Sequence, residues 1–359
     1  MMSSLFIFIN AMRLPATTLT RSVARSCIRR SPSLAPIALS TPSRYLSTTV
    51  PRFTPETDTL INQGKVKGLL SPKVSQPENS IVLTLSCQDQ LGVVKNVSEF
   101  LYNNHHNILS SDQFLDPTSN RFFMRITAQA QNGLDIAPLR QEFGKLAENI
   151  GLEWHMHVAS NKPKVMVMVS KIGHCLNDLL FRASADQIPI EIPLIVSNHP
   201  TYQALAKSYE IPFLHLPVNR DTKEQQEEEL LKLVKEHKID YIVLARYMQV
   251  LSPKLCKEMS GRIINIHHSF LPSFKGAKPY HQAYDRGVKL IGATAHFVTS
   301  DLDEGPIIEQ GVERVDHTLN PKSLSHVGSN VESIVLARAV KWVSEHRVLL
   351  SGHKTVVFD

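Results

Sequence analysis

Short apolar runs alternate with amphipathic segments through the second half of the chain, and this alternation constrains the fold more than any other feature. The first run, residues 165–170, is apolar up to its last residue, Ser170, as expected of a strand buried on both faces of a sheet. Strands that alternate with helices predict a parallel, doubly wound α/β sheet with right-handed crossovers. The expected strands are 165–170, 190–197, 213–216, 240–245, 262–267, 290–298 and 306–315, and the expected helices are 174–185, 200–207, 222–237, 252–258 and 321–346.

A different order of elements precedes this region. The expected strands are 81–87, 107–115, 121–130 and 152–159, and the expected helices are 91–103 and 134–149. This βαββαβ order is typical of the ferredoxin-like fold. The sequence therefore predicts an α/β protein with a small ferredoxin-like domain at residues 79–160 and a larger, mostly parallel α/β domain at residues 163–359.

The first 46 residues have the composition of a targeting segment. Before Glu56 the chain contains seven arginines and no acidic residue, which is typical of a mitochondrial or plastid transit peptide. Residues 44–49 resemble a matrix-processing site, with cleavage at its second or third residue. We expect residues 1–46 to direct the protein to the mitochondrial matrix, with a disordered basic arm as the alternative. Residues 47–78 contain Pro and Gly without periodicity and are expected to form a linker.

The charge balance argues against a nucleic-acid partner. The formal net charge is +6, but the six arginines of residues 1–46 account for all of it, so the remaining chain is near neutral. Nucleic-acid binding would need a basic face on the folded part. No run of 18 or more apolar residues is present, so we expect no membrane span.

Polar residues that follow two of the expected strands are the best candidates for a reactive site. Loops at the carboxyl ends of strands hold the ligands of open α/β sheets. Asn265 and His267 lie two apart at the end of strand 262–267, so their side chains share a face, and Asp303 follows strand 290–298. An amide, an imidazole and a carboxylate that converge suit acyl transfer, because two groups can hold an oxyanion while the third accepts a proton. A structural role for an Asn-x-His at a strand end is the alternative.

Four segments in this region, taken in order, resemble the catalytic half of the folate-dependent formyltransferases. They are Asn-Ile-His-His-Ser-Phe-Leu-Pro (265–272), Gly-Ala-Lys-Pro-Tyr-His-Gln-Ala (276–283), Gly-Ala-Thr-Ala-His-Phe-Val (292–298) and Leu-Asp-Glu-Gly-Pro-Ile-Ile (302–308). The doubled histidine and the Asp-Glu-Gly-Pro resemble the branch that hydrolyses 10-formyltetrahydrofolate to formate and tetrahydrofolate, which supports one-carbon and purine metabolism. The resemblance covers residues 164–359 almost throughout. It implies a hydrolase whose folate is the substrate and which needs no cofactor.

The resemblance also implies roles for individual residues. Asn265 would donate to the formyl oxygen. His267, as an imidazolium beside Asp303, would be a second donor. Asp303 would position the attacking water and accept its proton. Segment 241–251 resembles the part of the family that lines the pterin pocket. The residues expected to bind the folate are Leu244, Met248, Gln249, Leu251, Val298 and Thr299.

The formyl acceptor could be water, a ribosyl amine or initiator tRNA. In the ribosyl-amine branch a Gly-Ser-Asn run after the first strand holds the phosphate, and residues 170–177 lack it. The tRNA branch adds a C-terminal barrel and a basic face, which this chain does not have. Water is the remaining acceptor. Transfer to an amine, or a catalytically silent amino-acid sensor, are the alternatives.

Residues 89–94 resemble the ligand turn of ACT domains, which are small regulatory modules. The residues expected to bind an amino-acid effector are Asp89, Gly92 and Asn107. Gly92 would allow close backbone approach at a helix start. Simple helix capping by Asp89 is the alternative. Such modules also dimerise, so a homo-oligomer is expected.

Two further patterns receive plain structural interpretations. His268 is expected on the opposite face of its strand from His267, with a packing role. The histidine pairs 105/106, 155/157 and 267/268 do not form a recognised ligand set, so no metal site is expected. The charged run 224–229 is interpreted as a solvent-facing helix surface.

Overall fold

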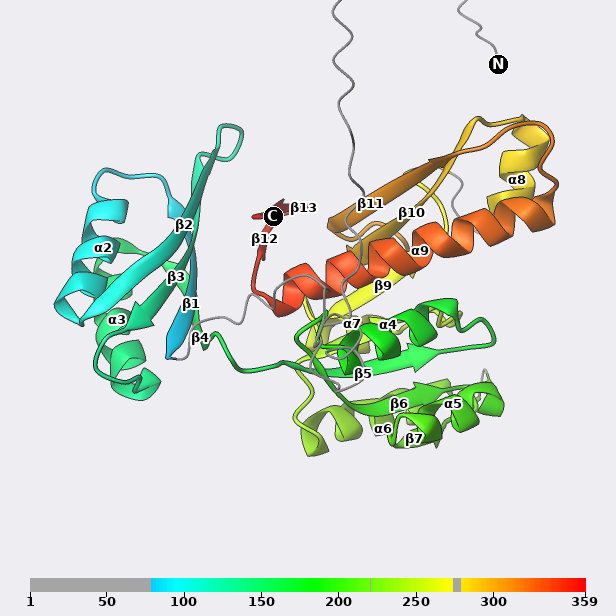
Figure 1. The fold of residues 1–359 in the computed structure, drawn as a ribbon, viewed down its shortest axis with the longest axis horizontal. Coiled ribbons are helices and arrows are strands. Elements are labelled where there is room, and N and C mark those ends of the chain that lie inside the picture. The colour runs from blue at the N-terminus through cyan, green and yellow to red at the C-terminus, as the bar shows by residue number, and fades with distance from the viewer. Residues whose placement is uncertain (1–78, 220, 274–278) are drawn as a thin grey trace, which may run out of the picture. The chain divides into compact units, whose positions relative to one another are not determined.

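The computed structural model describes residues 79–219, 221–273 and 279–359 (Figure 1). The predicted transit peptide and linker lie outside these residues. Within the described ranges, the helices are too short or too polar to cross a membrane.

Residues 80–158 form a four-stranded antiparallel sheet with two helices, and this confirms the βαββαβ prediction. The strand order is β2-β3-β1-β4, and both helices lie on one side of the sheet (Figure 1). Their core is built from alternate strand residues such as Leu83 and helix residues such as Val97 and Phe143. The elements are β1 (Ser80–Gln88), α2 (Val93–Asn103), β2 (His106–Asp116), β3 (Arg121–Ala130), α3 (Ile136–Ile150) and β4 (Glu153–Val158).

A seven-stranded sheet with the order β11-β10-β9-β8-β5-β6-β7 dominates the rest of the described chain. The five strands from β9 to β7 pair in parallel, whereas β10 pairs antiparallel with both β9 and β11. The prediction of a mostly parallel sheet is therefore confirmed. The strands are β5 (Lys164–Val169), β6 (Glu191–Ser197), β7 (Phe213–His215), β8 (Tyr241–Leu244), β9 (Ile263–His267), β10 (Leu290–Phe297) and β11 (Ile307–Arg314).

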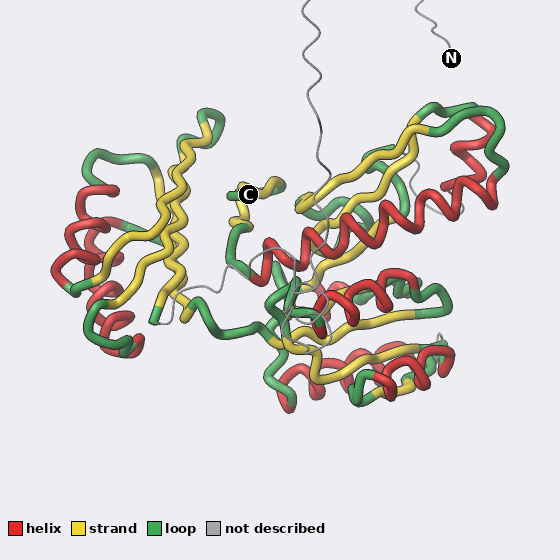
Figure 2. The backbone as a smooth tube through the Cα atoms, in the orientation of Figure 1, coloured by secondary structure: helices red, strands yellow, loops and turns green. Residues whose placement is uncertain are grey.

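Helices cover both faces of this sheet, as Figure 2 shows. Strand β5 explains why, because its side chains alternate between two cores: Val165 and Val167 contribute to one, and Met166 to the other. Helices α4 and α9 pack on the first core, and α6 and α7 on the second. The helices are α4 (His174–Ser184), α5 (Gln203–Ser208), α6 (Lys223–Glu236), α7 (Pro253–Glu258), α8 (Pro279–Arg286) and α9 (Pro321–Ser344).

The direction of the sheet reverses between β5 and β8. From β5 the chain builds outward through β6 and β7, and then returns to place β8 on the other side of β5. At such a switch point the loops at the strand ends diverge and leave a crevice for ligands. The two loops touch here, because the backbone N–H of Ser170 donates to the carbonyl of Arg246 at 3.3 Å.

Several elements differ from the sequence prediction. Helix α8 and a terminal hairpin of β12 (Val348–Ser351) and β13 (Lys354–Val357) were not predicted. The charged run 224–229 is not wholly solvent-facing, since Gln226 and Glu227 are 8% and 5% exposed. That interpretation was wrong because the buried pair contacts the loop after β8 rather than solvent.

Candidate active site

His267 and Asp303 meet at the carboxyl end of β9. His267 is the last residue of that strand, and Asp303 lies in the turn between β10 and β11. The imidazole Nδ1 is 3.2 Å from a carboxylate oxygen of Asp303, and the side chains are 6% and 10% exposed. Nε2 of His267 is buried and has no hydrogen-bond partner among the described residues. Nδ1 therefore donates to the carboxylate, and Nε2 is the atom left to face a reacting group.

Asn265 is oriented by His296, which lies directly opposite it on β10. Nδ1 of His296 is 2.9 Å from the carbonyl oxygen of Phe297, which can only accept, so Nδ1 carries the proton. Burial lowers the pKa of His296 despite that hydrogen bond and the nearby Asp303, so the ring is neutral. Nε2 then accepts from Nδ2 of Asn265 at 3.2 Å. One amide N–H of Asn265 is used in this way, and the other is available.

His296 also lies 3.8 Å from Asp303, so it connects the predicted catalytic residues. The structure thus brings Asn265, His267 and Asp303 together, with His296 among them. Sequence reasoning gave His296 no role. The signal that could have found it is register, because antiparallel pairing of β9 with β10 places the two side chains opposite each other.

Asp303 is held in a strained turn. Its φ is +58°, in the left-handed region that non-glycine residues seldom adopt. Two residues later, a Cβ on Gly305 would lie 1.7 Å from the carbonyl oxygen of Phe297, so only glycine fits there. This close approach fixes the turn against the end of β10 and aims the carboxylate at His267.

The electrostatics of the site keep Asp303 charged. Burial alone would raise the pKa of its carboxyl group. The hydrogen bond with His267, and the coulombic effect of that residue, outweigh burial and hold the pKa of Asp303 below its usual range. A carboxylate is therefore present at neutral pH beside Nδ1 of His267, while Nε2 of the same ring has no partner among the described residues.

His268 does not follow the predicted strand alternation. Strand β9 ends at His267, and the ring of His268 lies 5.2 Å from that of His267 and 6.1 Å from the ring of Tyr280. Burial, with the charge of Arg246 next in importance, lowers the pKa of His268 to about 4. His268 is thus a neutral, mostly buried neighbour of the reactive pair.

The residues expected to bind folate lie around the loop that follows β8. Three of them are apolar and are held by the second core: Leu244 and Leu251 belong to it, and Val298 packs against it. Met248 is 55% exposed and Gln249 is exposed, so both side chains are free to contact a ligand. Thr299 lies in the loop after β10, where its hydroxyl donates to the carbonyl of Asp301 at 3.1 Å.

Buried polar side chains anchor this loop at several points. The backbone N–H of Met248 donates to the hydroxyl of Ser170 at 3.0 Å. Gln226 donates to the hydroxyl of Tyr247 at 3.0 Å, and Glu227 accepts from the N–H of Ser252 at 2.9 Å. These contacts preorganise a backbone edge next to an exposed methionine, which suits a flat polar heterocycle.

The residues expected to bind an effector lie on two different segments of the βαββαβ domain. Gly92 has φ +93° and is the N-cap of α2, and no side chain caps that helix. The alternative role of Asp89 as a capping residue is therefore wrong, although Asp89 and Gly92 share the turn after β1. Asn107 lies on β2, and its side chain makes no hydrogen bond to that turn within the described part of the chain.

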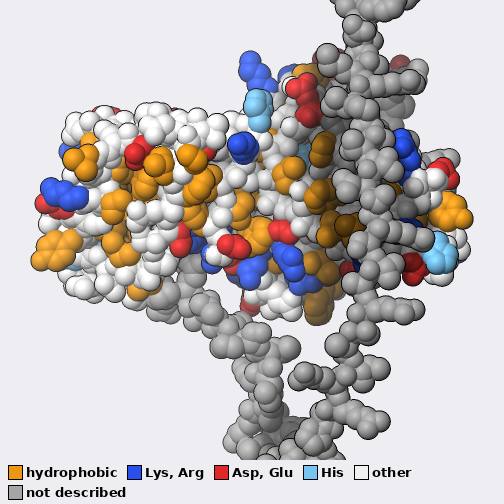
Figure 3. Space-filling view, turned by 90° about the horizontal axis from the view of Figure 1, so that it is seen from above, with side chains coloured by type: hydrophobic (Ala, Val, Ile, Leu, Met, Phe, Trp, Pro, Cys, Tyr) orange, Lys and Arg blue, Asp and Glu red, His pale blue; other side chains and the backbone are white. Residues whose placement is uncertain are grey.

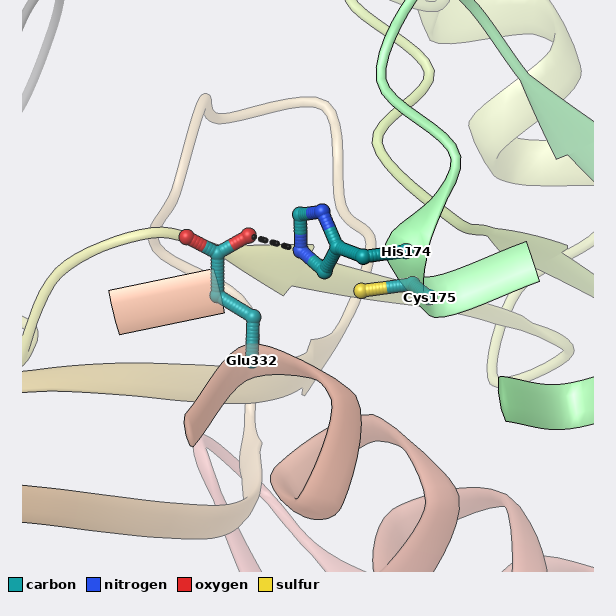
Figure 4. A group of neighbouring side chains, drawn as sticks. All are labelled: His174, Cys175 and Glu332. Atoms are coloured by element: carbon teal, nitrogen blue, oxygen red, sulfur yellow. Dashed lines mark hydrogen bonds and ion pairs between the residues drawn. The ribbon is translucent and has the colours of Figure 1, made fainter. Parts of the chain in front are cut away.

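A second cluster of polar side chains lies beside the first. Figure 4 shows His174 pointing toward the carboxylate of Glu332, with Cys175 next to it. His174 Nε2 is 2.8 Å from Oε2 of Glu332, and the hydroxyl of Tyr280 donates to Oε1 at 2.6 Å. Arg246 Nε is 3.4 Å from Oε2, so a cation already balances this carboxylate. His174, Cys175 and Glu332 form the one group of three His, Cys or acidic residues in the described ranges that could hold a metal ion. Their possible metal-ligand atoms lie within 4.8 Å of one another.

Comparison with known proteins gives consistent matches. The formyl transferase family matches residues 163–340. A formyltetrahydrofolate deformylase of Corynebacterium sp. (strain P-1) is 47% identical over 277 residues, which are 77% of this chain and 97% of that protein. The solved structure of a formyltetrahydrofolate deformylase from Burkholderia mallei ATCC 23344 has a TM-score of 0.76 and 51% identity, and the match covers 78% of this chain and all of that one. A phosphoribosylglycinamide formyltransferase from Anaplasma phagocytophilum is more distant, with a TM-score of 0.51 and 31% identity over 55% of this chain and 96% of that one.

Proposed function

The chain belongs to the formyltetrahydrofolate deformylase family and hydrolyses 10-formyltetrahydrofolate to formate and tetrahydrofolate, and we propose that Asn265, His267 and Asp303 carry out this hydrolysis. The observation that carries the proposal is the buried His267–Asp303 pair at 3.2 Å, with Nε2 of His267 unpartnered. A buried polar atom without a partner is costly, and a polar group of the substrate would relieve that cost.

The chemistry needs both a base and an oxyanion site. The formyl carbon of the substrate is an amide carbon, so neutral water attacks it slowly. Asp303 orients the water and takes one of its protons while the water oxygen bonds to that carbon. The second amide N–H of Asn265 and the Nε2–H of a protonated His267 hold the oxygen that becomes negative. Cleavage of the carbon–nitrogen bond returns this proton to N10 and gives tetrahydrofolate and formic acid, which releases its remaining proton to solvent as formate.

His296 acts as a positioning residue in this mechanism. Its neutral ring accepts from Asn265 and leaves the other amide N–H directed away from β10. Because Nδ1 is committed to the carbonyl of Phe297, Nε2 cannot donate, and the amide of Asn265 cannot turn over without losing that bond.

The surroundings of α4 support water rather than a ribosyl amine as the acceptor. The ring of Tyr202 covers Gly173, since a Cβ there would lie 2.3 Å from the ring. The Tyr202 hydroxyl donates to the carbonyl of Lys171 at 2.9 Å, which fixes the ring in place. The turn that cradles a phosphate in the amine-transferring branch is therefore filled by an aromatic side chain.

The test is release of both products with water as the acceptor. The full chain is incubated with 10-formyltetrahydrofolate, and formate and tetrahydrofolate are followed together. Equal amounts of the two are expected, and added glycinamide ribonucleotide should not change the rate. Formylated amine in place of formate would instead indicate a transferase.

We also propose that residues 1–46 direct the protein to the mitochondrial matrix. The support is compositional, since arginines occur there without any acidic residue. N-terminal sequencing of the mature protein should begin near Leu46 or Ser47. A mature protein that retains residues 21–30 would contradict this.

For the βαββαβ domain we propose binding of a small amino acid at the turn after β1 and self-association through β2. Strand β2 is an edge strand, and Figure 3 shows apolar side chains exposed on this domain. Each of four apolar side chains of β2 is 36–43% exposed: Ile108, Leu109, Phe114 and Leu115. Edges of this kind are usually covered. Calorimetry with glycine and methionine, and sedimentation of the full chain with and without them, test the two proposals.

A further inference from the structure

Arg246 is a buried cation whose hydrogen-bonding capacity is only partly used among the described residues. Its side chain is 8% exposed, and its φ is +64°, so the backbone is strained at this residue. Nε and Nη1 are buried and make no hydrogen bond to any described residue. A buried guanidinium with unmet donors indicates a missing partner that can accept hydrogen bonds.

Glu332 balances the charge of Arg246 but does not satisfy its donors. Oε2 of Glu332 is 3.4 Å from Nε of Arg246, and it already accepts from His174 at 2.8 Å. Oε1 accepts from the hydroxyl of Tyr280 at 2.6 Å. Each carboxylate oxygen therefore has a shorter partner, and Nη1 of the guanidinium is left for another group.

A line of polar rings connects this cation to the reaction centre. His267, His268 and Tyr280 succeed one another, with ring centroids 5.2 and 6.1 Å apart, and Tyr280 contacts Glu332. The charge of Arg246 also acts on His268. Arg246 is thus linked to the His267–Asp303 pair through Glu332, Tyr280 and His268.

We propose that Arg246 binds the carboxylate of the product formate. This inference rests on the proposed function, in which formate forms next to the charged Asp303. Repulsion between the two carboxylates drives formate away from Asp303, and the unmet Nη1–H of Arg246 can donate a charge-assisted hydrogen bond to the anion. The ring of His268 is neutral, so it adds no charge to the path of the anion from Asp303 to Arg246.

The experiment is product inhibition of the full chain by sodium formate, with sodium chloride at equal ionic strength as the control. In Arg246→Gln the inhibition constant for formate should rise about tenfold or more, because charge-assisted hydrogen bonds are lost. Arg246→Lys should give a smaller rise, since it keeps the positive charge but loses the guanidinium geometry. Arg338→Gln is the matched control, because Arg338 is 59% exposed and lies on the surface of α9.

Arg246→Gln leaves Glu332 without its cation and could fail to fold. The double variant Arg246→Met, Glu332→Gln removes the charge pair together, and it should show the same loss of formate binding. Saturation-transfer NMR of formate with the parent and the variants gives a readout that does not depend on turnover. A signal is expected for the parent and the control, and none for the double variant.

Three outcomes would overturn the proposal. In the first, the inhibition constant for formate stays the same in both Arg246→Gln and the double variant. In the second, the parent shows neither inhibition by formate nor an NMR signal. In the third, the KM for folate rises while inhibition by formate is unchanged. The third would assign Arg246 to a carboxylate of the folate substrate instead. Failure of the proposed function is distinct, because the parent would then release no formate from 10-formyltetrahydrofolate.

Discussion

Replacing Asp303 with asparagine isolates the chemistry of the carboxylate from the shape of the site. Asparagine keeps the size, and its carbonyl can still accept from Nδ1 of His267. It also tolerates the left-handed conformation of this residue, whose φ is +58°. The turn should therefore persist, and Asp303→Asn should fold with nearly the stability of the parent.

Two losses set the expected size of the effect. The base is removed, and general base catalysis contributes about 10²- to 10⁴-fold. The ion pair with His267 at 3.2 Å is also removed, and a hydrogen bond to a charged group contributes about 1.5–3 kcal/mol. These effects overlap because both act through one carboxylate. We expect kcat to fall about 10³-fold, or about 4 kcal/mol in activation free energy.

The assay is release of tetrahydrofolate by the full chain under saturating 10-formyltetrahydrofolate, with KM measured in parallel. KM should change far less than kcat, because the interaction is made mainly in the transition state. Asp301→Asn is the matched control. Its side chain is exposed in the same turn, and the hydrogen bonds at Asp301 that hold the turn use its backbone oxygen. If kcat of Asp303→Asn stayed within a few-fold of the parent, Asp303 would not be the base.

Three other substitutions probe the remaining parts of the site. Asn265→Ala should lower kcat about 10²- to 10³-fold through loss of an oxyanion donor, with little change in KM; an equal rise in KM would show a binding role instead. Met248→Ala should raise KM for the folate with kcat nearly kept, since the 55% exposed side chain is free to pack on the ligand; steady-state kinetics separate the two. The pKa of His268 falls from its usual 6.5 to about 4 on folding, so the unfolded state binds more protons between these values and stability is lost as pH falls through this window. Thermal unfolding of His268→Gln should depend less on pH between 4 and 6.5 than that of the parent, and parallel curves would refute this.

Local sequence patterns predicted much of the fold because the spacing of apolar residues follows the periodicity of strands and helices. Strand β5 reads as a continuous apolar run, and its residues do divide between two cores. The spacing of two residues between Asn265 and His267 placed both at the end of one strand, and both reach the neighbourhood of Asp303 in the structure. The register between β9 and β10 could not be predicted from the sequence. His296 was therefore missed, although it lies opposite Asn265.

Long-range polar contacts were beyond any local pattern. Gln226 and Glu227 lie in a run of charged residues that is typical of a solvated helix face, yet they anchor Tyr247 and Ser252 in the folate loop. The meeting of His174 with Glu332 likewise depends on how α4 and α9 pack on the same core. Hydrophobic periodicity places such helices against a sheet but does not determine which polar side chains meet between them.

Backbone strain separates the two functional loops from ordinary turns. Most non-glycine residues with positive φ here are exposed turn residues, such as Asn120 and Lys238, whose conformation nothing but the turn requires. Arg246 and Asp303 differ, because their side chains are only 8% and 10% exposed. Rules of local conformation favour glycine, asparagine or aspartate at such positions, and an arginine there destabilises the fold. Since the strain at each residue directs a charged group into the protein, one beside His267 and the other beside Glu332, the departures from local rules coincide with the groups assigned to the reaction and to its product.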